Sequence, residues 1–169
     1  AHASLYGGDP DRMAISGDSA GGNLAAAVIA KQLERDRVTS FAAASLLYGI
    51  YDWALLARTP AELPFYRWQS TQRAPSNYHG DTSPNEPGIS PACSPHLASF
   101  PPTQLLVGSE DPLLRQSQTF AAHLQTAGAE TDLHIYSGMP HSFLQIEEYP
   151  GCNEALTTIW AFLKAKLAK

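Results

Sequence analysis

The 169-residue chain has few cysteines, no cluster of basic residues and no long apolar run. Cys93 and Cys152 are widely separated and lack the close spacing of a metal site, so we expect two free thiols. The formal net charge of −5, without a lysine- or arginine-rich run, argues against a nucleic-acid partner. No apolar stretch reaches membrane-spanning length, and the first residues lack the basic-then-apolar pattern of a secretory signal. We therefore expect a cytoplasmic protein.

The size and composition are those of one globular domain. A chain of this length ordinarily forms a single domain and buries roughly 68–70% of its unfolded surface. Its apolar content of 44% is ordinary for such a domain. We expect one domain over residues 1–169, with an irregular, proline-rich insertion at about 59–102.

The hydrophobic pattern alternates between strand and helix, which is typical of an α/β fold with a largely parallel sheet flanked by helices. The N-terminal residues 1–8 are expected to end a helix and enter a turn. Strands are expected near 12–16, 43–48, 103–107 and 132–136, and helices near 20–35, 114–127 and 153–168. The stripes expected to face the core are Leu24, Val28, Ile29 and Leu33 in the first long helix, and Leu156, Ile159, Trp160 and Leu163 in the last.

The most informative segment is Gly17-Asp18-Ser19-Ala20-Gly21-Gly22, which fits the pattern G-x-S-x-G between a predicted strand and a predicted helix. A serine on such a tight turn is forced into a strained backbone conformation that exposes its hydroxyl. Gly17 and Gly21 lie where a Cβ is expected to collide with neighbouring backbone. N–H groups at the start of the helix can help to hold negative charge. The alternative is a serine N-cap without chemistry, but the order of strand, motif and helix favours a nucleophile.

An acid and a base follow the serine at the expected places. Asp111 follows the predicted strand 103–107, and His141 lies in the loop after the predicted strand 132–136. The carboxyl ends of parallel strands meet at one rim of the sheet, so both side chains are expected beside Ser19. The chain order serine, aspartate, histidine is that of the α/β-hydrolases.

Two other carboxylates compete with Asp111 for the role of the acid. Asp52 follows an earlier strand, although the ordering rule favours Asp111. Glu110 is adjacent, but the residue before a proline is restricted to extended conformations, which suits a fixed carboxylate at Asp111. Among the other histidines, His134 lies in the middle of a predicted strand.

The chain resembles the hormone-sensitive-lipase-like branch of the α/β-hydrolases, mainly microbial carboxylesterases. The resemblance covers essentially the whole chain. It rests on Gly7-Gly8-Asp9-Pro10-Asp11-Arg12, Gly17-Asp18-Ser19-Ala20-Gly21-Gly22-Asn23-Leu24-Ala25, Ser94-Pro95, Asp111-Pro112-Leu113 and Gly138-Met139-Pro140-His141-Ser142-Phe143. It implies Ser19 as nucleophile, Asp111 as acid and His141 as base. It also implies that the backbone N–H of Ala20 is an oxyanion donor, and that Gly17, Asp18 and Gly21 form the nucleophile elbow.

The resemblance further implies hydrolysis of short- to medium-chain carboxylic esters through an acyl-enzyme, without a metal or cofactor. Candidate substrate-binding residues are Phe65, Trp68, Leu113 and Phe143. The aromatic residues of the insertion, which include Tyr66 and Tyr78, either cover the pocket or pin a long loop to the body.

The sequence departs from the family pattern in three places. Ser142 stands where a glycine is common after the catalytic histidine, and Leu114-Arg115-Gln116-Ser117 replaces a second charged cluster. The H-G-G-G segment, whose N–H groups complete the oxyanion hole, is absent. We therefore expect about the C-terminal half of such an enzyme, with an exposed edge at strand 12–16. An exposed edge invites pairing, so we expect a homo-oligomer unless an N-terminal partner segment covers it.

Two alternative functions stay open on the sequence alone. The first is an impaired or inactive half-enzyme, because each missing oxyanion donor costs about 10²–10³ in kcat. The second is a small-ligand-binding protein on the same scaffold. Plant gibberellin receptors are of that kind but lack the catalytic histidine, whereas His141 is present here.

Overall fold

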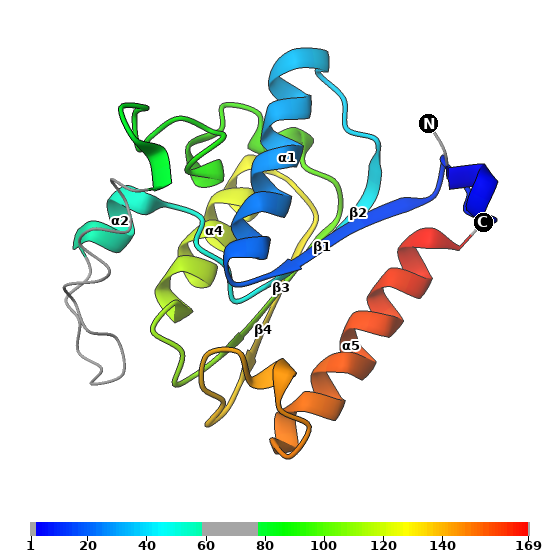
Figure 1. The fold of residues 1–169 in the computed structure, drawn as a ribbon, viewed down its shortest axis with the longest axis vertical. Helices are drawn as coiled ribbons and strands as arrows, with labels where there is room; N and C mark the ends of the chain where they lie inside the picture. Colours follow the sequence, from blue (N-terminus) through cyan, green and yellow to red (C-terminus); the bar gives the residue numbers. More distant parts are fainter. Residues whose placement is uncertain (1–2, 59–77, 169) are drawn as a thin grey trace.

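Four parallel strands form one sheet in the order β1-β2-β3-β4, in a computed structural model that describes residues 3–58 and 78–168 (Figure 1). The four predicted strands are confirmed, with bounds that shift by one or two residues. They are β1 (Met13–Asp18), β2 (Phe41–Leu47), β3 (Thr103–Gly108) and β4 (Thr131–Tyr136).

The strands differ in burial according to their place in the sheet. β3 has a neighbour on each side and is buried along its whole length. β1 and β4 lie at the two edges and are only partly buried. Successive residues of a strand face opposite sides, so Leu105 enters one core and Leu106 the other.

Helices cover both faces of this sheet (Figure 1). Helices α1 (Ala20–Asp36) and α4 (Leu114–Ala127) pack on one face, where Ile29, Leu33 and Phe120 join the core. Helix α5 (Pro150–Leu167) packs on the opposite face against a second cluster. These three helices were predicted and are confirmed. No helix in the described part of the chain is long and apolar enough to cross a membrane.

Several short elements were not predicted. Helix α2 (Trp53–Arg58) follows β2, and 3-10 turns form at Pro91–Cys93, Leu97–Ser99 and Phe143–Gln145. The N-terminal helix end expected at 1–8 is the 3-10 turn Ala3–Tyr6. Within the expected insertion, residues 78–102 are irregular apart from these turns and one further turn of helix at 78–79. Phe65, Tyr66 and Trp68 lie outside the described residues.

The core-facing stripes predicted for α1 and α5 are partly wrong. Leu24 and Val28 are 54% and 43% exposed, and Leu156 and Trp160 are 50% and 66% exposed. Other residues, several of them with small side chains, take the buried positions instead. The buried residues that replace the expected ones are Ala25, Ala26 and Ala30 in α1, beside Ile29 and Leu33, and Cys152, Ala155 and Phe162 in α5.

The turn from β1 into α1 has no room for a side chain at two glycines. A Cβ on Gly17 would overlap the carbonyl oxygen of Gly21, and a Cβ on Gly22 would lie 3.1 Å from the Cα of Gly49. The collision expected at Gly21 is wrong, because the nearest atom there would be Asp18 Oδ1 at 3.8 Å, an ordinary contact. Gly21 already belongs to the first turn of α1, and its missing side chain would point away from the packed backbone.

The two motif glycines should therefore respond differently to the same substitution. Gly17→Ala should lower the free energy of unfolding by about 1–3 kcal/mol, because the backbone must shift to admit the methyl group. Gly21→Ala should leave it unchanged or raise it by up to about 1 kcal/mol, because alanine is the better helix former. Urea unfolding of both variants beside the wild type measures this difference. Equal losses in the two variants would contradict the packing described here.

Candidate active site

Ser19 occupies a strained position between β1 and α1. Its φ of 52° and ψ of −115° confirm the strain predicted for this turn. A non-glycine residue in such a conformation costs about 1–3 kcal/mol and persists only where its surroundings fix it. The Ser19 N–H donates to the carbonyl oxygen of Leu47 at 2.9 Å, and the Ser19 carbonyl accepts from the N–H of Gly22 at 3.1 Å. The turn is thus fastened both to β2 and to α1.

Ser19, His141 and Asp111 form one hydrogen-bonded series at the carboxyl rim of the sheet. Ser19 Oγ lies 2.9 Å from His141 Nε2, and His141 Nδ1 lies 2.9 Å from Asp111 Oδ2. The Asp111 side chain is 0% exposed, and its Oδ1 accepts the backbone N–H of Leu113 at 2.7 Å. A fixed carboxylate on Nδ1 leaves Nε2 as the acceptor for the serine hydroxyl, which is the arrangement of a nucleophile, base and acid.

The competing carboxylates are engaged elsewhere. Asp52 Oδ1 accepts the backbone N–H of Leu55 at 2.8 Å, at the start of α2. Glu110 is exposed, and its Oε1 accepts the hydroxyl of Ser109 at 3.3 Å. His134 lies within β4, as the sequence predicts. The structure therefore brings Asp111, and neither Asp52 nor Glu110, to His141.

The loops that carry Asp111 and His141 pack directly on each other. The Ser109 N–H donates to the Tyr136 carbonyl at 2.9 Å, and the Glu110 N–H donates to the Met139 carbonyl at 3.1 Å. A Cβ on Gly108 would overlap the same Met139 carbonyl oxygen. This close backbone approach fixes the acid relative to the base.

Two neighbouring residues were not identified from the sequence. Gln145 Nε2 donates to Asp18 Oδ2 at 2.7 Å and so links the histidine loop to the elbow. The ring of Tyr48 lies edge-on to His141, with centroids 5.1 Å apart. Neither belongs to a motif, and the one signal for Tyr48 is its place directly after a strand that ends at the catalytic rim.

The remaining predicted site residues have varied surroundings. Ala20 begins α1, where the first N–H groups have no acceptor within the helix and the helix dipole is positive. Leu113 is buried, and Phe143 is buried against Tyr48 and Tyr136. Their assignment to substrate binding stays a prediction.

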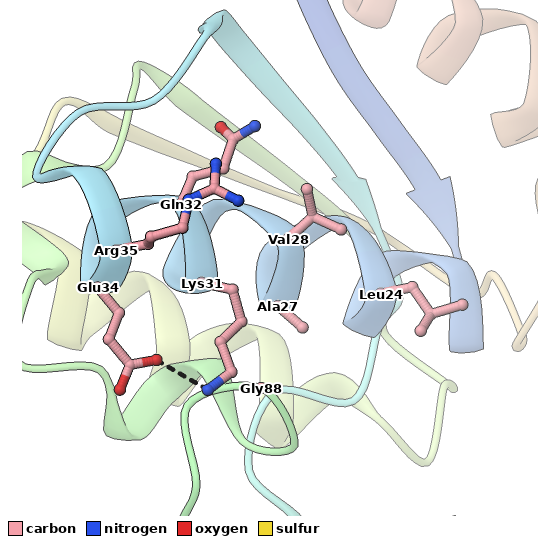
Figure 2. A pocket seen from close by; sticks show the side chains of 8 residues that line it. All are labelled: Leu24, Ala27, Val28, Lys31, Gln32, Glu34, Arg35 and Gly88. Atoms are coloured by element: carbon pink, nitrogen blue, oxygen red, sulfur yellow. Dashed lines mark hydrogen bonds and ion pairs between the residues drawn. The ribbon is translucent and has the colours of Figure 1, made fainter.

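Depressions in the described surface include a groove along α1 and a recess beside β1. A groove of about 740 Å³ follows α1, and Figure 2 shows Leu24, Val28 and Lys31 among the side chains that line it. A smaller recess of about 340 Å³ is lined by residues that include Gly17, Tyr48, Gln145 and Leu156. Neither is lined by Ser19, Asp111 or His141. The smaller recess is the one that adjoins the elbow, through Gly17 and Asp18.

The described residues include two free thiols and hold no cluster suited to a metal ion. Across residues 3–58 and 78–168, no group of three or more histidine, cysteine, aspartate or glutamate side chains is arranged to hold a metal ion. Cys93 is exposed and Cys152 is buried, and both are free thiols. Partial burial and the nearby Asp52 raise the pKa of the Cys93 thiol, which keeps it protonated at neutral pH.

Sequence comparison identifies the family. A family model described as the alpha/beta hydrolase fold matches residues 1–145. The carboxylic ester hydrolase LipN of Mycobacterium tuberculosis is 29% identical over 99% of this chain and 47% of its own length. An ethyl acetate hydrolase of Pseudomonas putida is 30% identical over 85% of this chain and 46% of its own length. The chain spans about half the length of these curated relatives.

Solved structures agree with this assignment. Carboxyl esterase 2 of the mycorrhizal fungus Tuber melanosporum superposes with a TM-score of 0.87 at 28% identity, over 98% of this chain and 57% of that one. A hormone-sensitive lipase from a metagenome library gives a TM-score of 0.83 at 28% identity, over 96% and 57% of the two chains. The family model matches most of the chain, and the chain superposes on esterase structures. The chain therefore belongs to the hormone-sensitive-lipase-like branch of the α/β-hydrolase fold family.

Proposed function

We propose that this protein is a carboxylic ester hydrolase that uses Ser19, His141 and Asp111 as its catalytic triad. The observation that carries the proposal is the unbroken series of two 2.9 Å hydrogen bonds from Ser19 Oγ through His141 to the buried Asp111. The names of the relatives, carboxylic ester hydrolase and ethyl acetate hydrolase, support the reaction class.

The reaction proceeds through an acyl-enzyme. Ser19 Oγ attacks the ester carbonyl carbon while His141 Nε2 takes the hydroxyl proton, and the carbonyl oxygen becomes an oxyanion. Collapse of this tetrahedral intermediate breaks the bond between the acyl carbon and the alcohol oxygen. The alcohol leaves with the proton that His141 had taken. Water then attacks the acyl group with His141 again as base, and this step releases the acid and restores Ser19. Asp111 stays ionised throughout and stabilises the charged imidazole.

The oxyanion site limits the rate that this chain reaches alone. The Ala20 N–H, at the positive end of α1, is the proposed donor from these residues. The H-G-G-G segment of the family is absent from the sequence, and each missing donor costs about 10²–10³ in kcat. We therefore expect slow turnover by this chain alone. An impaired or inactive half-enzyme is the extreme form of the same proposal. The hydrogen-bonded His141 argues against the alternative of a ligand-binding protein without turnover.

Short- to medium-chain esters are the proposed substrates. The Pseudomonas putida relative is named for ethyl acetate, which has a two-carbon acyl group and is at the short end of that range. The proposal needs no metal or cofactor, because the triad supplies both the nucleophile and the proton transfer. It also includes the cytoplasmic location expected from the sequence, which cell fractionation would test.

Hydrolysis of p-nitrophenyl acetate and butyrate tests the triad. Wild-type protein should turn over these esters, and Ser19→Ala should fall to the buffer rate because the attacking oxygen is gone. Ser137→Ala removes an exposed hydroxyl from the histidine loop and should keep wild-type turnover. Intact mass spectrometry after a fluorophosphonate should show one adduct on the wild type and on Ser137→Ala, and none on Ser19→Ala. Equal rates in all three proteins, with no adduct, would mean an inactive remnant.

We also propose that β1 pairs with a second copy of this chain. Among residues 3–58 and 78–168, β1 has a hydrogen-bonded neighbour on the β2 side alone. Beside it, Leu156 and Trp160 on α5 are half or more exposed, and Leu156 lines a recess together with Ser16 and Gly17 of β1. A strand edge without a hydrogen-bonding partner, flanked by exposed apolar side chains, is a template for pairing with another chain. Ser16, Gly17, Leu156 and Trp160 define the edge surface.

Light scattering after gel filtration tests this association. The wild type should have twice the chain mass, and the double variant Leu156→Lys with Trp160→Lys should have the mass of one chain, because two buried charges oppose contact. A control pair, Leu24→Lys with Val28→Lys, changes two other exposed apolar residues, which lie on α1, and should stay dimeric. A monomeric wild type would contradict the pairing and favour a partner segment as the occupant of this edge.

A further inference from the structure

Tyr48 has an unusual backbone conformation at the catalytic rim. It follows β2 directly and has a φ of 38°, in the left-handed region that large side chains rarely adopt. Four non-glycine residues of the described chain have a positive φ, and three of them, Ser19, Tyr48 and Ser142, surround His141. Strain of this kind persists where the surrounding structure determines it, and it gathers at functional sites.

The ring of Tyr48 is directed onto the catalytic histidine. It is 1% exposed and meets the His141 imidazole edge-on, at 5.1 Å between centroids and 69° between planes. On its other side it contacts Phe143, at 6.0 Å between centroids. The backbone below is held by a 2.7 Å hydrogen bond from the Tyr48 N–H to the Leu106 carbonyl. The ring therefore has little freedom to move away from His141.

The contact with Tyr48 restricts a motion of the His141 imidazole that its two hydrogen bonds do not oppose. The hydrogen bonds at Nδ1 and Nε2 hold two atoms of the ring, and these two bonds by themselves do not oppose a tilt about the line that joins those atoms. A packed aromatic edge or face opposes this tilt. Burial, with added repulsion from Asp18 and Asp111, raises the pKa of the Tyr48 hydroxyl, so this group stays neutral and the ring is the part that acts.

We propose that Tyr48 is a positioning residue, whose strained backbone presses its ring against His141 and holds the imidazole in line with Ser19 and Asp111. The proposal rests on the triad function proposed above. A small misplacement of the base lowers the rate of proton transfer steeply, because the reacting atoms must be aligned.

The rate of Ser19 phosphonylation by a fluorophosphonate, followed by intact mass, measures this role. Tyr48→Leu should slow the reaction by about tenfold to a hundredfold, and Tyr48→Phe should stay within about twofold, since the ring is kept. Tyr48→Met, which fills the site with a flexible side chain, should slow the reaction as much as Tyr48→Leu does. It replaces Tyr48→Leu in this test if that variant does not fold. The control is Tyr136→Leu, which removes a buried ring that contacts Phe143 in the same cluster. It should lose stability and keep the wild-type rate.

A readout without turnover separates this proposal from the triad function. The hydrogen-bonded Nδ1–H of His141 should give a sharp downfield proton signal in the wild type, Tyr48→Phe and Tyr136→Leu. In Tyr48→Leu and Tyr48→Met the signal should broaden by exchange. If the wild type takes up no phosphonate, the triad proposal fails and this signal still decides the positioning. Unchanged signals in every variant, or equal slowing in Tyr136→Leu, would overturn the role of Tyr48.

Discussion

Backbone hydrogen bonds that extend the parallel ladder past the strand ends hold together the loops that carry the proposed triad. The Ser19 N–H donates to Leu47, the Tyr48 N–H donates to Leu106, and the Ser109 N–H donates to Tyr136. Each bond joins the segment just after one strand to the end of the next strand in the sheet. A single such bond contributes about 1 kcal/mol, but three in succession fix the loops of β1, β2 and β3 to a common frame. The 2.9 Å spacings of the triad depend on that frame.

Strain and close packing are concentrated at the same rim. Ser19 and Ser142, which lie beside the Ser19–His141 hydrogen bond, both have a positive φ. Gly17 and Gly108 admit carbonyl oxygens where a methyl group would overlap them. In the interior of the sheet, β3 is fully buried along its length. A rigid sheet can hold strained loop residues in place because moving them would break ladder bonds and disturb a packed core.

The catalytic groups and the edge surface share part of the chain. Gly17 and Asp18 belong to the elbow, and they also line the recess that Leu156 borders beside β1. Whatever pairs with β1 therefore comes close to the nucleophile turn and to the Gln145–Asp18 hydrogen bond. This adjacency connects the two proposals, because both involve the turn that contains Gly17 and Asp18.

The sequence by itself determined the strands, the three long helices and the order of Ser19, Asp111 and His141, because these follow from local periodicity, glycine spacing and the geometry of strand-to-helix turns. It did not determine which faces of α1 and α5 are buried. Alanine and leucine are both apolar, and the way α1 is turned on the sheet, which buries Ala25 and exposes Leu24, was decided by tertiary packing. The contacts of Tyr48 with His141 and of Gln145 with Asp18 were also decided by the tertiary structure. These contacts join residues about a hundred positions apart, and no local pattern encodes which side chains meet when three loops converge on one rim.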